Sequence, residues 1–347
     1  MKRFLAGFAA ILMMIACCGC AANEPEEIPS TTTTTTTQTT TTTKAPVKDY
    51  NFLTGETNLV KGATTRPVAV MINNLGKVRP QRGIDKADLY VEAETEGGIT
   101  RIMAVFASQE TLPDELGPIR SARTHFVRIA DALDTIYVHA GGSPKAKALI
   151  KSTNLAEIDF CGADGGAFWR DSELRKKNGL EHSLLSNRKK ISSRIEKRGY
   201  RTNYSAKAPF SFGEVAGSKA ASKVQIKVSA SQNVRFEYDA AKGVYLKYAG
   251  KKNLTPHNSY KGGQLSAANV VVMFAKRFKE DASHVTFELD NGTALLASGG
   301  TAREIKWSRT DSQLSFTEAD GSSAKFATGK TYICLVHSGY KDDTVCS

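Results

Sequence analysis

The chain lacks most of the short motifs by which enzyme classes are recognised. It contains no Walker phosphate-binding loop and no Gly-x-Ser-x-Gly nucleophile elbow. Its six histidines show no paired spacing of the kind that holds zinc, and no Cys-x-x-Cys lies in the body of the chain. We therefore expect no metal, no cofactor and no nucleotide-driven chemistry.

Long apolar runs are also missing from the body, so no segment there is expected to span a bilayer. The beginning is different. Lys2 and Arg3 precede an apolar stretch over 4–16, and Cys17-Cys18-Gly19-Cys20 follows it. A short apolar stretch after a basic start is typical of a secretory signal. The cysteines at its end predict a bacterial lipoprotein signal peptide and lipobox over residues 1–20.

Two cysteines are candidates for lipidation. Before Cys17, the small Ala16 and the aliphatic Met14 occupy the positions that lipoprotein processing requires. Before Cys20, Gly19 is suitably small, but Cys17 occupies the position where an aliphatic side chain normally lies. Cys17 is therefore the favoured lipidation site, and Cys20 is the alternative.

A polar tether is predicted over residues 21–49. It contains threonine from Thr31 to Thr43, interrupted only by Gln38. Such a composition cannot bury apolar surface, so the segment should be an extended, solvated linker. The sequence thus predicts a folded body held by a lipid to the outer face of the cell membrane.

Positive charge exceeds negative charge along the chain. The formal net charge is +12, and removal of Lys2 and Arg3 leaves 12 − 2 = +10. A basic exported protein has anionic neighbours in phospholipid headgroups, teichoic acids and peptidoglycan carboxylates. Lysine spread over the surface for solubility would give the same net charge, so both interpretations stay open. Nucleic acid is not an expected partner outside the membrane.

The folded body divides by pattern into two halves. Residues 50–205 predict apolar strands over 68–74, 89–94, 99–107 and 135–140, with helices after Ser121 and over 145–151 and 186–198. Residues 206–347 show short alternating strands, with hairpin signals at 290–292 and 319–321. The predicted fold is α+β, with an N-terminal α/β domain over 50–205 and a mostly antiparallel β domain over 206–347.

One strand-to-helix junction has the composition of an anion site. His139 ends the strand, and Gly141-Gly142-Ser143-Pro144 follows it. Ser143 can cap the helix, and the glycines let backbone N–H groups face an anion at its positive end. Tight packing alone would also favour such a turn, so that interpretation stays open.

Several arginines lie at turns or at element ends instead of on outer helix faces. Their guanidinium forks suit carboxylate or phosphate recognition. The alternative is that they pair with nearby acidic residues to fix loops, and convergence of two or three of them would favour a ligand. These arginines are Arg79, Arg101, Arg120, Arg123 and Arg170.

Longer motifs resemble those of the YerB-like lipoproteins, a family known mainly as a domain of unknown function. They are Arg66–Asn74, Arg79–Gln81, Glu96–Arg101, Gly117–Arg123, His139–Pro144, Phe168–Asp171 and Glu181-His182, with Asn269–Val272, Trp307–Arg309 and Gly329–Tyr332 in the second half. The resemblance implies a two-domain, lipid-anchored surface protein of a Firmicute-type bacterium. It implies no established activity.

Three functions are compatible with these residues. The favoured one is a module that binds an anionic envelope ligand, such as a wall glycan, or a partner protein. A wall hydrolase or transferase is the alternative, with Glu96 or His182 as general acid or base and the arginines stabilising charge. A scaffold whose β domain meets a partner protein is the third. The candidate ligand-binding residues are Arg101, Arg120, Arg123, His139, Gly141, Gly142, Ser143, Arg170 and His182.

The cysteines of the body give two further expectations. Cys334 and Cys346 could form a disulfide outside the cell, which would leave Cys161 unpaired. Cys161 is expected to be a half-buried free thiol, and a catalytic Cys161 beside His139 or His182 is the alternative. Because spacing identifies no set of nucleophile, base and orienting group, binding or scaffolding is favoured over catalysis.

Overall fold

The computed structural model describes residues 48–311 and 313–347, which belong to one compact unit. The predicted signal peptide, the lipidation candidates Cys17 and Cys20, and nearly all of the tether lie outside the described residues. Within the described residues, no helix has the length and apolar character needed to cross a membrane.

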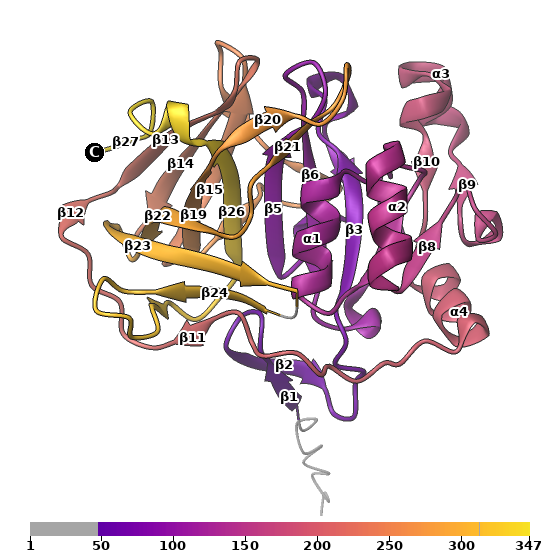
Figure 1. Cartoon of the computed structure of the whole chain (residues 1–347), viewed down its shortest axis with the longest axis horizontal. Coiled ribbons are helices and arrows are strands. Elements are labelled where there is room, and N and C mark those ends of the chain that lie inside the picture. Colours follow the sequence, from indigo (N-terminus) through magenta and orange to yellow (C-terminus); the bar gives the residue numbers. More distant parts are fainter. Residues whose placement is uncertain (1–47, 312) are drawn as a thin grey trace, which may run out of the picture. The chain divides into compact units, whose positions relative to one another are not determined.

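The α-helices of the described residues lie in the first half of the folded body, over 50–205 (Figure 1). Their starts follow from capping side chains: Ser143 accepts a hydrogen bond from the Ala146 amide at 3.3 Å, and Asn187 accepts one from the Lys190 amide at 2.9 Å. Gly199 ends the last helix with φ 63°. The helices are α1 (Thr124–Ala132), α2 (Pro144–Thr153), α3 (Ser172–Asn178) and α4 (Arg188–Arg198).

Helix α1 begins later than the sequence predicted. The expected cap, Ser121, lies in extended backbone three residues before the helix. The Arg120 amide donates to the carbonyl of Met71 at 2.9 Å, and the Ala122 amide donates to the carbonyl of Gly141 at 2.8 Å. A helix capped by Ser121 would need the carbonyls of Ser121 and Ala122. These carbonyls instead accept from Nη1 of Arg101 at 2.7 Å and from the Ser143 amide at 3.3 Å, so the helix begins only at Thr124.

A central sheet of eleven strands runs through both halves of the chain (Figure 1). Its order is β12-β23-β22-β19-β26-β5-β6-β3-β7-β8, with β24 paired to β23. From the first half come β3 (Val68–Asn73), β5 (Leu89–Glu94), β6 (Thr100–Phe106), β7 (Ile136–His139) and β8 (Glu157–Asp159). From the second half come β12 (Lys219–Ala220), β19 (Asn269–Ala275), β22 (Asn291–Ser298), β23 (Thr301–Thr310), β24 (Gln313–Thr317) and β26 (Thr331–His337).

The two halves meet where β5 pairs in parallel with β26. Tyr90 lies opposite Tyr332 in that register, and their rings stack with centroids 5.1 Å apart. β3 pairs antiparallel with β6 and parallel with β7, so the first half of the sheet is mixed. The α+β class expected from the sequence is confirmed, and the halves share one sheet.

The inner strands of the central sheet, such as β3 and β5, are covered on both faces. Alternate residues of β3 point to opposite faces, as the pleat requires. Met71 belongs to the core that includes Phe126 of α1 and Ile150 of α2. Val70 belongs to the core that includes Ile191 of α4 and the second sheet. Strands buried on both sides therefore read as nearly continuous apolar runs.

The second sheet has six strands in the order β16-β15-β14-β13-β27, with β18 paired to β15. Phe236 of this sheet contacts Tyr332 of the central sheet at a ring separation of 5.1 Å. Its strands are β13 (Lys223–Ser229), β14 (Gln232–Asp239), β15 (Val244–Gly250), β16 (Thr255–Pro256), β18 (Ser266–Ala267) and β27 (Val345–Cys346).

Short strand pairs and 3₁₀ turns complete the described fold. The pairs are β1 (Lys48–Asn51) with β2 (Glu56–Val60), β4 (Gln81–Arg82) with β17 (Ser259–Tyr260), β9 (Trp169–Arg170) with β10 (Leu184–Leu185), β11 (Ser211–Phe212) with β25 (Lys325–Phe326), and β20 (Arg277–Lys279) with β21 (Val285–Phe287). The turns are η1 (Gly76–Val78), η2 (Ile84–Lys86), η3 (Gln109–Thr111), η4 (Gly165–Ala167), η5 (Leu180–His182) and η6 (Ser338–Tyr340).

The hairpin predicted at 290–292 is wrong. Asn291 and Gly292 belong to β22 itself, where they pair with Ser308 and Trp307 of β23. β21, which precedes them, pairs with β20 instead. The turn predicted at 319–321 is present, with Gly321 at φ 88°.

A buried ion pair joins the second sheet to the central sheet. Glu92 of β5 and Lys247 of β15 are fully buried, with 2.7 Å between Oε2 and Nζ. Asn74 and Thr100 donate to the other oxygen of Glu92 at 2.7 and 2.9 Å. Burial alone would raise the pKa of Glu92, but Lys247, the Tyr332 hydroxyl and the charge of Arg79 hold it below its ordinary value. Glu92 is therefore a charged anchor between the two sheets.

Candidate functional site

Two of the predicted arginines line one small pocket, which we name the Arg120–Arg170 pocket. Its volume is about 220 Å³. Its walls come from the segment before α1, the loop after β8, strand β9 and turn η5. The lining residues are Ile119, Arg120, Ser121, Ala140, Phe160, Cys161, Arg170, Glu181 and Leu184.

Arg120 is held by its backbone, and its guanidinium contacts Glu181 of turn η5. Its carbonyl accepts a hydrogen bond from the Ala140 amide at 3.0 Å. Its Nη1 donates to the carbonyl of Glu181 at 2.9 Å and to Oε2 of Glu181 at 3.2 Å. The side chain of Glu181 is 75% exposed, so an incoming anion can replace that carboxylate at little cost.

Arg170 enters the same pocket from β9, where it pairs with Leu184 of β10. Its guanidinium carbon lies 5.0 Å from the ring centroid of Phe160, and its Nη1 donates to the carbonyl of Leu180. Burial lowers the pKa of Arg170, and the nearby charge of Arg120 lowers it further. The pocket thus places two guanidinium groups against one exposed carboxylate.

His182 lies beside this pocket without lining it. Its Nδ1 is 2.8 Å from Nδ2 of Asn73. Because the Asn73 amide nitrogen is a donor, Nδ1 accepts and the proton of the neutral ring lies on Nε2. Burial, followed by the charges of Lys77 and Arg120, lowers the pKa of His182. At neutral pH the ring is therefore uncharged.

Arg101 and Arg123 are buried and share the carboxylate of Glu96. Nη2 of Arg101 contacts Oε1 of Glu96, and Nε of Arg123 donates to Oε2 at 2.8 Å. Burial would raise the pKa of Glu96, but the two guanidinium groups hold it below its ordinary value. For these two arginines the geometry matches the loop-fixing alternative.

His139 is fully buried in β7. Its Nδ1 lies 2.9 Å from the carbonyl oxygen of Gly141, and its Nε2 lies 2.9 Å from a carboxylate oxygen of Glu157. Both ring nitrogens are therefore occupied within the protein. His139 holds the turn after β7 in place and does not line the Arg120–Arg170 pocket.

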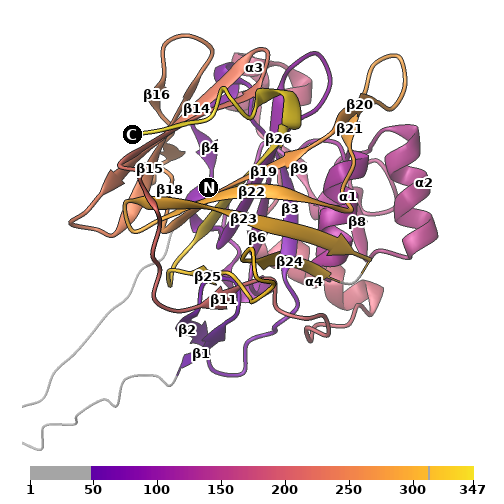
Figure 2. The same ribbon diagram turned by 60° about the vertical axis from the view of Figure 1, so that its left-hand side comes forward.

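The glycine–serine junction holds an anion that belongs to the chain. Ser143 donates to Oε2 of Glu280 at 3.1 Å, and Thr124, the first residue of α1, donates to Oε1. Glu280 is 7% exposed and follows β20, in the hairpin that Figure 2 shows beside α1 and α2. A carboxylate is favourable at the positive ends of helices. The predicted anion-binding turn is thus occupied by an internal carboxylate.

The two glycines of this junction make different backbone contacts. Gly141 adopts φ 64°, a conformation that favours glycine, and its amide donates to Oδ1 of Asp159 at 2.6 Å. Gly142 pairs with Ala122 in a parallel bridge. The turn is therefore built into the surrounding backbone.

Cys161 is the thiol nearest the arginines. It is exposed at the pocket, and burial, followed by the charge of Asp159, raises its pKa. A raised pKa makes the thiolate scarce, and His139 has no ring nitrogen left to activate it. Cys161 is a free thiol, but it is exposed, whereas the sequence predicted a half-buried one. Its raised pKa does not fit a catalytic cysteine.

The disulfide expected between Cys334 and Cys346 is absent from the described residues, where both cysteines are free thiols. Cys334 is buried in β26 of the central sheet, and Cys346 pairs with Val224 in the second sheet. No cluster of His, Cys, Asp and Glu suited to a metal ion occurs within residues 48–311 and 313–347.

Sequence reasoning missed two contributors to these sites. Phe160 places an aromatic face under Arg170, and Glu280 lies 137 residues from the serine that it contacts. Neither has a local motif. Only the acidic character of Glu280 within a basic segment could have drawn attention to it.

Two family models match the chain. The DUF3048 N-terminal domain, described as a protein of unknown function, matches residues 53–201, and the DUF3048 C-terminal domain matches residues 224–333. The chain belongs to the DUF3048 family. This membership confirms the resemblance to YerB-like proteins that the motifs indicated.

A DUF3048 relative and a solved structure extend this result. The curated protein "Putative lipoprotein YerB" of Bacillus subtilis (strain 168) is 30% identical over 298 residues, covering 82% of this chain and 85% of the relative. The crystal structure of the YerB protein from Bacillus subtilis has a TM-score of 0.74 at 28% identity, and the match covers 86% of this chain and 99% of that one. The similarity therefore extends over nearly the whole described fold.

Proposed function

We propose that this protein is a lipoprotein anchored to the outer face of the cell membrane that binds an anionic group of the cell envelope in the Arg120–Arg170 pocket. The anchor is supported by the lipobox-like start and by the relative from Bacillus subtilis, which is named as a lipoprotein. The observation that carries the binding function is the convergence of two guanidinium groups from separate segments on one small pocket.

The size of the pocket favours a small charged group. Its volume of about 220 Å³ is below the roughly 300–1,000 Å³ typical of pockets for drug-sized ligands. A carboxylate or phosphate at the end of a larger molecule would fit. It would replace the exposed carboxylate of Glu181 on Arg120 and accept a second hydrogen bond from Arg170.

The geometry supports binding over the hydrolase or transferase alternative. Glu96, one proposed general base, is bonded to both Arg101 and Arg123, and its lowered pKa makes it a weak base. His182 is neutral and near the pocket, but its Nδ1 accepts a hydrogen bond from the Asn73 amide and its Nε2 carries the proton, so in this tautomer neither nitrogen is free to act as a general base. We therefore propose no reaction.

Binding to purified cell-wall sacculi tests the proposal. The double variant Arg120→Gln/Arg170→Gln should bind about a hundredfold more weakly, because hydrogen bonds from a charged group contribute roughly 1.5–3 kcal/mol each. The control, Lys176→Gln/Lys177→Gln, removes the same charge from exposed positions on α3. Equal binding by the wild type and both double variants would contradict the proposal.

A further inference from the structure

A second group of basic side chains lies on α4, outside the Arg120–Arg170 pocket. The helix sequence, RKKISSRIEKR, carries six basic residues and one acidic residue. Ile191 and Ile195 are buried in the core beneath it. The burial of these two residues fixes the helix, so its charged side chains face outward.

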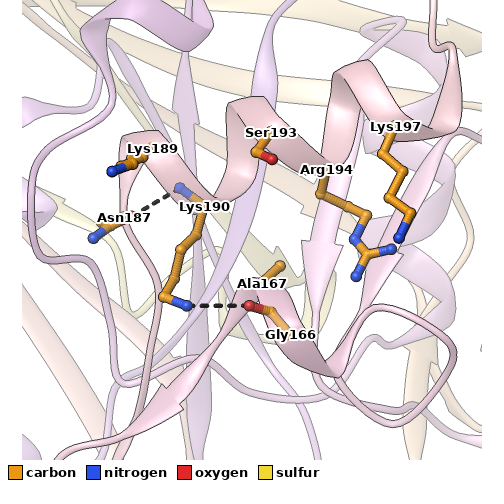
Figure 3. A pocket seen from close by; sticks show the side chains of 8 residues that line it. All are labelled: Gly166, Ala167, Asn187, Lys189, Lys190, Ser193, Arg194 and Lys197. Carbon is orange, nitrogen blue, oxygen red and sulfur yellow. Dashed lines mark hydrogen bonds between the residues drawn. The ribbon is translucent and has the colours of Figure 1, made fainter.

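A groove runs along this helix (Figure 3). Its volume is about 490 Å³, more than twice the 220 Å³ of the Arg120–Arg170 pocket. Four of its lining side chains are cationic, and no carboxylate lines it. The lining residues are Gly166, Ala167, Asn187, Lys189, Lys190, Ser193, Arg194 and Lys197.

Internal contacts hold part of this positive charge in place. Lys190 donates to the carbonyl of Gly166 at 3.1 Å, a bond drawn in Figure 3. Arg194 lies 3.3 Å from Oδ1 of the buried Asp164, and Arg198 donates to both oxygens of the same carboxylate. One negative charge therefore serves two arginines, and the groove keeps a net positive charge.

Two exposed cations, Lys189 and Lys197, lie in one row of the helix. Lys189, Ser193 and Lys197 are spaced four residues apart, which places neighbours about 5–6 Å from one another. Each of the two lysines is exposed at an end of this row. Such a row offers successive contacts to a ligand with regularly repeated negative charges.

We propose that this groove binds a linear phosphodiester polymer. Charge complementarity and the row of cations support this occupant over a membrane surface. A helix that lies in a membrane needs an exposed apolar face, and the apolar residues of α4 are buried. The large exposed apolar residues of the described chain (Tyr50, Val60, Leu180, Phe278 and Val345) all lie outside α4.

Gly166 provides a way to close the groove without changing its charge. A Cβ built there would lie 3.7 Å from Nη2 of Arg194, at ordinary contact distance. The backbone at Gly166 is outside the left-handed region, so a side chain there causes no backbone strain. Gly166→Leu should therefore fill the space beside Arg194.

The test measures binding of a purified glycerol-phosphate polymer to the full chain at low salt. Lys189→Gln/Lys197→Gln should weaken binding about tenfold, since exposed ionic contacts contribute modestly and additively. Gly166→Leu should also weaken it, although every charge remains. The salt dependence should follow counterion release, with a log–log slope of about 0.7 per phosphate contact, and should become shallower in the lysine variant.

Three controls decide the outcome. Lys176→Gln/Lys177→Gln should leave polymer binding unchanged. The weakening by Lys189→Gln/Lys197→Gln should persist when Arg120→Gln/Arg170→Gln is also present, so this result is independent of the proposed function of the pocket. Equal weakening by the α3 variant would show diffuse surface charge and overturn the proposal. Binding to phosphatidylglycerol vesicles but not to the polymer would also overturn it, in favour of a membrane contact.

Discussion

At the residue scale, Glu96 is the charge on which two buried guanidinium groups depend. Glu96→Gln keeps the shape of the side chain but removes the only carboxylate that contacts both Arg101 and Arg123 among the described residues. We expect the free energy of unfolding in urea to fall by about 3 kcal/mol, because buried charges lose their partner. Glu181→Gln, at an exposed ion pair with Arg120, should cost less than about 1 kcal/mol. Equal costs would contradict this account of Glu96.

A second residue gives a pH dependence. His125 is fully buried against Phe126 and Phe287, and neither ring nitrogen has a hydrogen-bond partner within the described residues. Burial, followed by the charges of Arg123 and Arg101, lowers its pKa from 6.5 to about 3. Between these values the unfolded chain binds a proton that the folded chain does not.

The free energy of unfolding should therefore fall as the pH drops below 6.5. His125 alone contributes a slope of about 1.4 kcal/mol per pH unit until the folded pKa is reached. His125→Phe removes this contribution, so denaturation curves between pH 6 and 4 should show a shallower loss of stability. Parallel pH profiles for the wild type and His125→Phe would disprove the assignment.

At the element scale, the β20–β21 hairpin supports the starts of α1 and α2 through Glu280. Glu280→Gln removes a negative charge from two helix N-termini and should lower the free energy of unfolding by about 1–2 kcal/mol. Amide exchange should become faster in the first turns of both helices. Glu288→Gln is the matched control, because Glu288 is exposed just after the same hairpin. An unchanged exchange rate in Glu280→Gln would contradict this role.

Local signals predicted several elements whose cause is local. The cap at Ser143, the stop at Gly199 and the apolar run of β5 all depend on neighbouring residues. The start of α1 depends on hydrogen bonds from Arg101 and Ser143 to the carbonyls of Ser121 and Ala122, which no local pattern contains. Strand β23 also escaped prediction, although Ile305 and Trp307 alternate inward along it.

The candidate site divides in the same way. The sequence predicted Arg120 and Arg170 as ligand-binding residues because guanidinium groups bind anions. Their convergence on one pocket follows from the pairing of β9 with β10 and from the loop after β8. The same reasoning predicted Arg101 and Arg123 as ligand-binding residues, but both are bound to the carboxylate of Glu96. Residue type indicates what a side chain can bind, and tertiary structure decides which partner it meets.

At the scale of the whole molecule, the shared sheet makes a prediction about unfolding. Trp169 lies in the first half and Trp307 in the second, so Trp169→Phe and Trp307→Phe each leave one fluorescent reporter. Because β5 pairs with β26 and Glu92 pairs with Lys247, both reporters should show the same urea midpoint. Two separated midpoints, corrected for the cost of each substitution, would show that the halves unfold independently.

The central claim is that an anionic envelope group occupies the Arg120–Arg170 pocket. Nitrogen spectra of the arginine side chains, recorded while solubilised wall fragments are added to the full chain, test it most directly. The Nε–H signals of Arg120 and Arg170 should shift together along one saturation curve. Those of Arg101 and Arg123 should not shift, because these side chains stay bound to Glu96. Saturable wall-fragment binding that leaves the Arg120 and Arg170 signals unmoved would contradict it.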